Sequence, residues 1–286
     1  MYRRMLPALL LTAGVLAGCK PERTAAQPGS SARADAASAA PAVVTVTATD
    51  YKLAVPASIP AGVVTLRLVN HGKELHQAQL VRIADGKTMA DLEAALKQAG
   101  PPPSWATFVG GPNAVVPGQE SASTSELTPG SYVALCLIPG PDGVPHVMKG
   151  MAQPFQVTGS SAQAALPAAQ DTIRLVDYAF ELSRPLTAGH HTILVVNGGP
   201  QTHELVLLRM TPGKTVKDFG GWVDAGMKGP PPAMPMGGVA ALENGDQSVL
   251  SVDLPSGEYG LVCFVPDAHD GKYHLIHGMG ENFQVS

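Results

Sequence analysis

Two short segments of the chain carry a cysteine, a histidine and a methionine in the same order. These residues are Cys136, His146 and Met151 in the first segment, and Cys263, His274 and Met279 in the second. A thiolate, an imidazole and a thioether are the soft and borderline ligands that suit a copper ion moving between two oxidation states. The two segments therefore predict one copper site in each half of the chain.

Both segments belong to a tandem duplication. Before the cysteine, matching residues lie 127 positions apart, as in Asp50-Tyr51 and Asp177-Tyr178. After it the spacing becomes 128, as in Gly150-Met151 and Gly278-Met279. A unit that occurs twice predicts two domains and not a many-repeat solenoid. We expect a signal peptide at 1–18, a flexible Ala/Ser/Pro tether at 19–41, a first domain at 42–158, a linker at 159–170 and a second domain at 171–286.

The elements that must position these residues are mainly short strands. The 286 residues include 31 glycines and 26 prolines, which favours many turns. Alternating runs rich in β-branched residues predict strands at 43–47, 63–69, 79–83, 172–176, 192–196 and 205–208. Thr88 and Thr215 can each cap a short helix. This pattern predicts two β-sandwiches, each with one helical insertion.

The amino terminus predicts export. Arg3-Arg4 precedes an apolar run from Met5 to Leu16 that is too short to span a bilayer. The following Leu16-Ala17-Gly18-Cys19 resembles the lipobox of bacterial lipoproteins, which implies cleavage before Cys19 and lipid on its sulfur. The alternative is a plain secretory signal. We expect a protein anchored by lipid to a bacterial membrane and facing the periplasm or the cell exterior.

Charge and cysteine content narrow the chemistry further. The formal net charge is −4 and no Lys/Arg cluster is present, which argues against nucleic acid as a partner. The chain has three cysteines, so assigning Cys19 to lipid leaves one in each repeat. A disulfide between Cys136 and Cys263 is the alternative to metal binding.

The segments leading to the two cysteines carry a family resemblance. Leu127, Gly130 and Tyr132 precede Cys136, and Leu254, Gly257 and Tyr259 precede Cys263. With the loops that follow, these segments resemble cupredoxins, the blue-copper proteins, whose fold is a Greek-key β-sandwich. The family's remaining ligand is a histidine a few residues after an Asn, which matches His76 after Asn70 and His203 after Asn197. The resemblance implies the ligand sets His76, Cys136, His146 and Met151, and His203, Cys263, His274 and Met279.

Several alternatives remain open at these sites. Nine residues separate Cys136 from His146, a loop that resembles the copper domain of nitrite reductases. His269 and His277 compete with His274 as ligand, although the His-x4-Met spacing of both repeats favours His274. Met227, Met234 and Met236 could form a separate thioether site for cuprous ion, although such methionines more often fill gaps.

The resemblance implies electron transfer through a blue-copper centre in each domain, with a redox protein as partner. Copper storage or delivery and a metal-free interaction module are the alternatives. We expect no enzymatic activity, because copper enzymes of this kind place a histidine beside the cysteine, where this chain has Leu135, Leu137, Val262 and Phe264.

Overall fold

The computed structural model describes residues 40–98, 103–162 and 164–286. Contacts join Ser38–Ser286 into one compact unit. The first repeat contains β1 (Ala42–Thr49), β2 (Lys52–Ala54), β3 (Ser58–Asn70), β4 (Gln79–Ile83), α1 (Met89–Leu96), β5 (Ala106–Phe108), β6 (Glu120–Leu127), β7 (Gly130–Leu135), the 3-10 helix η1 (His146–Lys149) and β8 (Ala152–Ala162). The second contains β9 (Asp171–Val176), β10 (Ala179–Leu182), β11 (Gly189–Asn197), β12 (His203–Met210), α2 (Val216–Asp224), β13 (Ala233–Leu242), β14 (Gln247–Leu254), β15 (Gly257–Val262), η2 (His274–His277) and β16 (Gly280–Val285).

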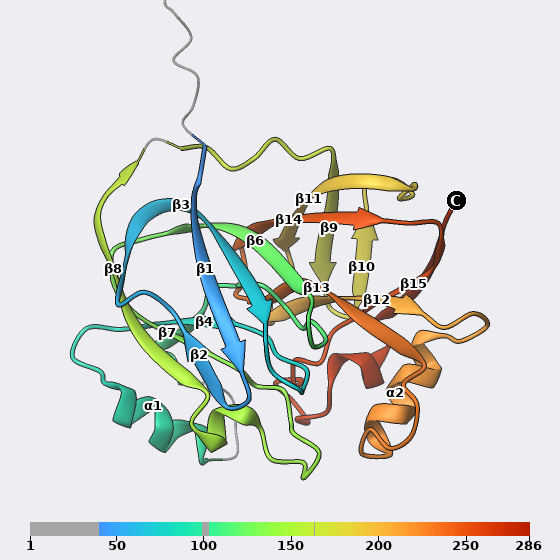
Figure 1. Ribbon diagram of the computed structural model, residues 1–286, viewed down its shortest axis with the longest axis horizontal. Helices are drawn as coiled ribbons and strands as arrows, with labels where there is room; N and C mark the ends of the chain where they lie inside the picture. Colours follow the sequence, from blue (N-terminus) through green and yellow to red (C-terminus); the bar gives the residue numbers. More distant parts are fainter. Residues whose placement is uncertain (1–39, 99–102, 163) are drawn as a thin grey trace, which may run out of the picture. The chain divides into compact units, whose positions relative to one another are not determined.

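Each repeat is a mixed β-sandwich, as predicted (Figure 1). In the first repeat β1 runs parallel to β3, which pairs antiparallel with β6, while β7 lies between β4 and β8. In the second repeat β9 runs parallel to β11, β11 pairs with β14, and β15 lies between β12 and β16. The same strand order in both repeats places the two cysteine loops at equivalent positions.

Strand pairing also joins the two repeats. β6 and β14 pair antiparallel, with Thr124 opposite Val249 and Ser123 opposite Leu250. The Gln79 side chain accepts a hydrogen bond from Ala241 N at 2.7 Å and donates one to Ala241 O at 3.0 Å. One sheet therefore runs through both repeats. β8 continues to Ala162 and pairs there with Gly62 of β3, so this strand extends into the segment predicted as a linker.

Both helices begin at the predicted threonines. Thr88 and Thr215 accept a hydrogen bond from the backbone N–H of Asp91 and Asp218, whose carboxylates accept one in return from the threonine N–H. This capping box satisfies two backbone donors at each helix start. Each helix packs its apolar face on a second apolar cluster of its own repeat, through Leu92 in α1 and Phe219 in α2.

Each sandwich has its own apolar core, which contains its cysteine and methionine. Tyr132 stacks on Phe155 and Tyr259 stacks on Phe283, in both cases with ring centroids 5.5 Å apart. The hydroxyls of Tyr132 and Tyr259 donate to the backbone oxygen four residues earlier, at 2.9 and 2.7 Å. The strand that leads to each cysteine is thus fixed by a buried ring and a satisfied hydroxyl.

The repeated Gly-Gly pairs mark close approaches between backbones. A Cβ added to Gly111 would lie 2.1 Å from Ala78 O, and one added to Gly238 would lie 2.0 Å from Leu205 O. Both glycines also have positive φ, at 118° and 130°. Only glycine fits here, because any side chain would push the strand away from the segment that carries the first histidine.

The signal segment, most of the tether and Cys19 lie outside the described residues. Within residues 40–98, 103–162 and 164–286, no helix is long and apolar enough to cross a membrane.

Candidate metal centres

Three predicted ligands of the first repeat meet at one buried point. The Nδ1 atoms of His76 and His146 are 3.2 Å apart, and Cys136 Sγ lies 3.4 Å from His146 Nδ1. All three residues are fully buried, with 0% of their surface exposed. The backbone N–H of Gln77 points at Cys136 Sγ from 3.5 Å. Two imidazole nitrogens and a sulfur therefore converge on a space of the size of one ion.

The second repeat reproduces this arrangement. The Nδ1 atoms of His203 and His274 are 3.0 Å apart, and Cys263 Sγ lies 3.5 Å from His274 Nδ1. These residues are also fully buried. The backbone N–H of Glu204 points at Cys263 Sγ from 3.4 Å.

Backbone hydrogen bonds fix each cysteine loop. Cys136 follows β7, its N–H donates to Met151 O at 3.2 Å, and its carbonyl accepts from Val147 N at 2.8 Å. The chain then turns back at Gly150, which has a φ of 96°, so that Met151 N reaches His146 O at 3.0 Å. Gly278 plays the same part in the second loop with a φ of 105°.

The loop that carries the first histidine is held by an asparagine. Asn70 Nδ2 donates to Glu74 O at 2.8 Å and to Val115 O at 2.9 Å, while Asn70 Oδ1 accepts from Gly72 N. Val115 in turn forms a β-bridge with His76. Asn197 makes the corresponding bonds to Gln201 O and Leu242 O, both at 2.8 Å.

Met151 and Met279 are fully buried. Met151 belongs to the same apolar cluster as Cys136, and Met279 to the same cluster as Cys263. Each methionine thus lies in the core beside its cysteine, and its backbone oxygen accepts a hydrogen bond from the N–H of that cysteine.

The outer nitrogen of each histidine has its own partner. His76 Nε2 lies 3.2 Å from Asp50 Oδ1, and His203 Nε2 lies 2.5 Å from Asp177 Oδ1. A carboxylate at Nε2 holds the proton there and leaves the Nδ1 lone pair free toward the sulfur. This role of Asp50 and Asp177 is not evident from residue spacing alone, although both belong to the repeated Asp-Tyr pair.

The two repeats hold their second histidine differently. His146 Nε2 lies 2.8 Å from Glu74 Oε2, and Tyr51 donates to the same carboxylate at 2.8 Å. In the second repeat Gln201 occupies the position of Glu74, and its Oε1 lies 3.4 Å from His274 Nε2. The carboxylate there comes instead from Asp267 on the cysteine loop, 3.9 Å from His274 Nε2.

Burial disfavours the charged forms of both cysteines and of three of the histidines in the metal-free protein. Burial raises the pKa of the Cys136 thiol to about 11 and also raises the pKa of Cys263. Burial lowers the pKa of His274 to about 4, with the neighbouring His203 adding to the effect. It also lowers the pKa values of His76 and His203, against the opposing effect of Asp50 and Asp177. A cation that binds must therefore displace a thiol proton, and it meets neutral imidazoles at His76, His203 and His274.

The structure separates the three histidines that competed in the second loop. His274 lies in the buried cluster, whereas His269 and His277 are exposed. His277 Nε2 lies 3.1 Å from Asp270 Oδ1. His277, Asp270 and the buried Asp267 form a separate, partly exposed cluster. Met227 and Met234 line a cleft between the repeats, and Met236 packs on the second core.

Each donor set fits copper. Two imidazole nitrogens and a thiolate, with a thioether on the same loop, are ligands that accept both copper oxidation states.

Comparison with known proteins gives likenesses only among solved structures. No protein-family model and no curated protein matches the chain. The auracyanin of Roseiflexus castenholzii aligns with 42% of this chain and 100% of its own, at 20% identity and a TM-score of 0.28. The copper nitrite reductase of Thermus scotoductus aligns with 85% of this chain and 61% of its own, at 14% identity and a TM-score of 0.24. The copper nitrite reductase of Nitrosomonas europaea aligns with 86% of this chain and 93% of its own, at 15% identity and a TM-score of 0.23.

These likenesses correct one prediction. The expected absence of enzymatic activity was wrong, because the solved structures that align with about 85% of the chain are copper nitrite reductases and multicopper oxidases, which are enzymes. The prediction relied on the residues beside each cysteine, whereas the alignment extends over both repeats.

Proposed function

We propose that the protein is a redox protein in which each repeat binds one copper ion and exchanges single electrons. The observation that carries this proposal is the duplicated His-Cys-His cluster, fully buried in both repeats and held at the outer histidine nitrogens. Copper supplies the one-electron chemistry when it is bound. The ligands we propose are His76, Cys136, His146 and Met151, and His203, Cys263, His274 and Met279.

The chain prepares these groups in three ways. Asp50 and Asp177 select the imidazole tautomer that turns Nδ1 inward. The backbone N–H groups of Gln77 and Glu204 favour the thiolate over the thiol. The surrounding cores exclude water and hold the donors in place, so that little rearrangement accompanies a change of charge.

We also propose how the protein meets its partners. Both cysteine loops expose apolar side chains next to the buried histidine, with Met148 41% exposed in the first loop and Ile276 51% exposed in the second. These surfaces suit a redox protein as partner. We further propose export and a lipid on Cys19 as the link to a membrane.

Reconstitution with cupric ion tests the redox proposal. We expect an intense visible band from thiolate-to-copper charge transfer and two copper ions per chain. The single variants Cys136→Ser and Cys263→Ser should each remove one ion and part of the band. Colourless protein without bound copper would contradict the proposal, and bound copper without reversible voltammetry would favour storage or delivery.

A further inference from the structure

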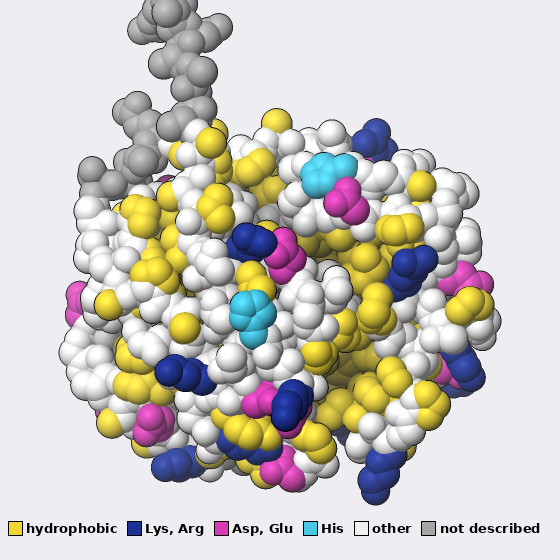
Figure 2. Space-filling view, in the orientation of Figure 1, with side chains coloured by type: hydrophobic (Ala, Val, Ile, Leu, Met, Phe, Trp, Pro, Cys, Tyr) yellow, Lys and Arg dark blue, Asp and Glu magenta, His cyan; other side chains and the backbone are white. Residues whose placement is uncertain are grey.

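A cleft between the two repeats has no role in the centres described above. Its volume is about 1540 Å³, larger than the roughly 300–1,000 Å³ of typical small-molecule sites. Figure 2 shows the molecular surface hollowed here, with apolar side chains in the hollow. Aromatic rings contribute from both repeats, namely Phe108, Phe219, Trp222, Phe264 and Tyr273. Such a lining suits a ligand with an aromatic body.

The cleft lies directly beside both centres. Leu137 and Phe264, which follow the two cysteines, line it, and so do Gln77 and Glu204, which follow the first histidine of each repeat. The cleft thus reaches within one residue of the proposed ligands of both repeats.

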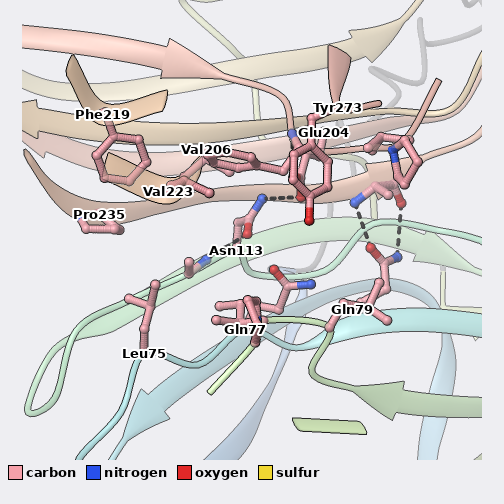
Figure 3. Close-up of a pocket in the computed structure, with 18 of the residues that line it drawn as sticks. Leu75, Gln77, Gln79, Asn113, Glu204, Val206, Phe219, Val223, Pro235 and Tyr273 are labelled. Atoms are coloured by element: carbon pink, nitrogen blue, oxygen red, sulfur yellow. Dashed lines mark hydrogen bonds between the residues drawn. The ribbon is translucent and has the colours of Figure 1, made fainter. Parts of the chain in front are cut away.

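One polar group in the cleft lacks a partner. Gln77 is only 6% exposed, yet its side-chain amide makes no hydrogen bond to any residue in the described part of the chain. Figure 3 shows this amide turned toward the space between the repeats. Because this amide borders the cleft and is not held by the chain, it is available to bind a ligand atom there.

The equivalent residue in the second repeat, Glu204, forms hydrogen bonds through its side chain. Glu204 Oε2 accepts from Asn113 Nδ2 at 3.0 Å, and Glu204 Oε1 accepts from Phe264 N at 3.0 Å (Figure 3). Gln77 is thus free where its counterpart is bound on both oxygens.

The charges around the cleft select against anions. Three acidic residues line it, Glu204, Glu243 and Asp267, and one basic residue, Arg209. The Asp267 carboxylate accepts hydrogen bonds from Tyr178 and Gln201. An uncharged ligand avoids this repulsion.

We propose that the inter-repeat cleft binds an uncharged aromatic molecule that carries a hydrogen-bonding oxygen, and that the Gln77 amide binds this oxygen. The apolar rings hold the body of the ligand, and Gln77 fixes its orientation. This inference does not depend on copper and stands or falls separately from the redox proposal.

Fluorescence of Trp222 provides the test. Trp222 lines the cleft and Trp105, the other tryptophan, does not, so Trp105→Phe leaves Trp222 as the reporter. The full chain is titrated with 2-acetonaphthone, with naphthalene as the probe that lacks the oxygen and 2-naphthoate as the anionic probe. We expect saturable quenching by 2-acetonaphthone and weaker binding of 2-naphthoate.

Variants then assign the contacts. Gln77→Leu should weaken 2-acetonaphthone binding about three- to tenfold, the value of one hydrogen bond, and leave naphthalene binding unchanged. Val223→Arg, which places a charge on the cleft wall, should abolish binding of both, whereas Val43→Arg, at an exposed site outside the cleft, should not. Unsaturable quenching, or an equal effect of Gln77→Leu on both probes, would overturn the proposal. Calorimetry on Trp222→Phe checks that the quenching reports binding.

Discussion

Glu204 of the second repeat accepts a hydrogen bond from Asn113 of the first repeat at 3.0 Å. The same carboxyl group accepts from Phe264 N, and the Glu204 backbone N–H points at Cys263 Sγ. One residue thus links the contact between the repeats to the second metal centre. Burial raises the pKa of Glu204, and the Asn113 bond opposes this effect.

Removal of the Glu204 carboxyl should destabilise the protein. Glu204→Leu leaves Asn113 Nδ2 and Phe264 N without this acceptor, which should cost about 1–3 kcal/mol of unfolding free energy. Glu204→Gln retains an acceptor oxygen and should cost less. Urea unfolding of the copper-free protein measures both, and equal midpoints for the two variants would argue against a structural role for the carboxyl oxygens.

Stability of the metal-free protein should fall at alkaline pH. The Cys136 thiol has a folded-state pKa of about 11 against an ordinary value of 9.0. The contribution of this thiol to the unfolding free energy is complete below pH 9. It is lost as the pH rises toward 11, because the thiol loses its proton at a lower pH in the unfolded chain than in the folded protein. The loss should be roughly 3 kcal/mol. Cys136→Ser has no thiol at this position, so its unfolding free energy should fall by this amount less between pH 9 and 11 in urea unfolding. An identical pH dependence in both proteins would contradict the predicted contribution of Cys136.

The carboxylates behind the histidines should control copper affinity. Asp50→Asn and Asp177→Asn remove the charge that fixes the imidazole tautomer and should weaken copper binding about 10- to 100-fold at the affected centre. Competition against a chelator measures this change. Asp85→Asn, at an exposed loop position, is the matched control. Unchanged affinity in Asp50→Asn would show that the tautomer is set by other contacts.

The choice of histidine in the second loop can be decided directly. In a Cys136→Ser background only the second centre should retain copper. His274→Asn should then abolish both the visible band and the bound ion, whereas His277→Asn should retain them, because His277 is exposed and paired with Asp270. The reverse result would move the ligand assignment to His277.

The elements of the two halves were predictable because they repeat. The duplicated strands, the helix caps at Thr88 and Thr215, and the clustered His and Cys positions all depend on residue type and local spacing. These are signals that a single sequence contains.

Contacts between the repeats were not predictable. β6 has the sequence ESASTSEL, whose small polar residues do not reveal which strand lies beside it. Its Ser125 donates to Ser248 of β14 at 2.9 Å, across more than a hundred residues. The free amide of Gln77 and the bond between Glu204 and Asn113 likewise depend on this packing. The expected absence of enzymatic activity went wrong for a related reason, since it was argued from the neighbours of each cysteine alone.

The pairing of β6 with β14 decides how each half can be studied. In the intact chain neither strand is a sheet edge, because each has a neighbour on both sides. Cutting the chain between the repeats would leave both strands with unpaired N–H and C=O groups, which are templates for aggregation. A protein with a single metal centre is therefore best obtained by a point substitution that removes the other centre. Each repeat covers the strand edge of the other and so protects it from aggregation.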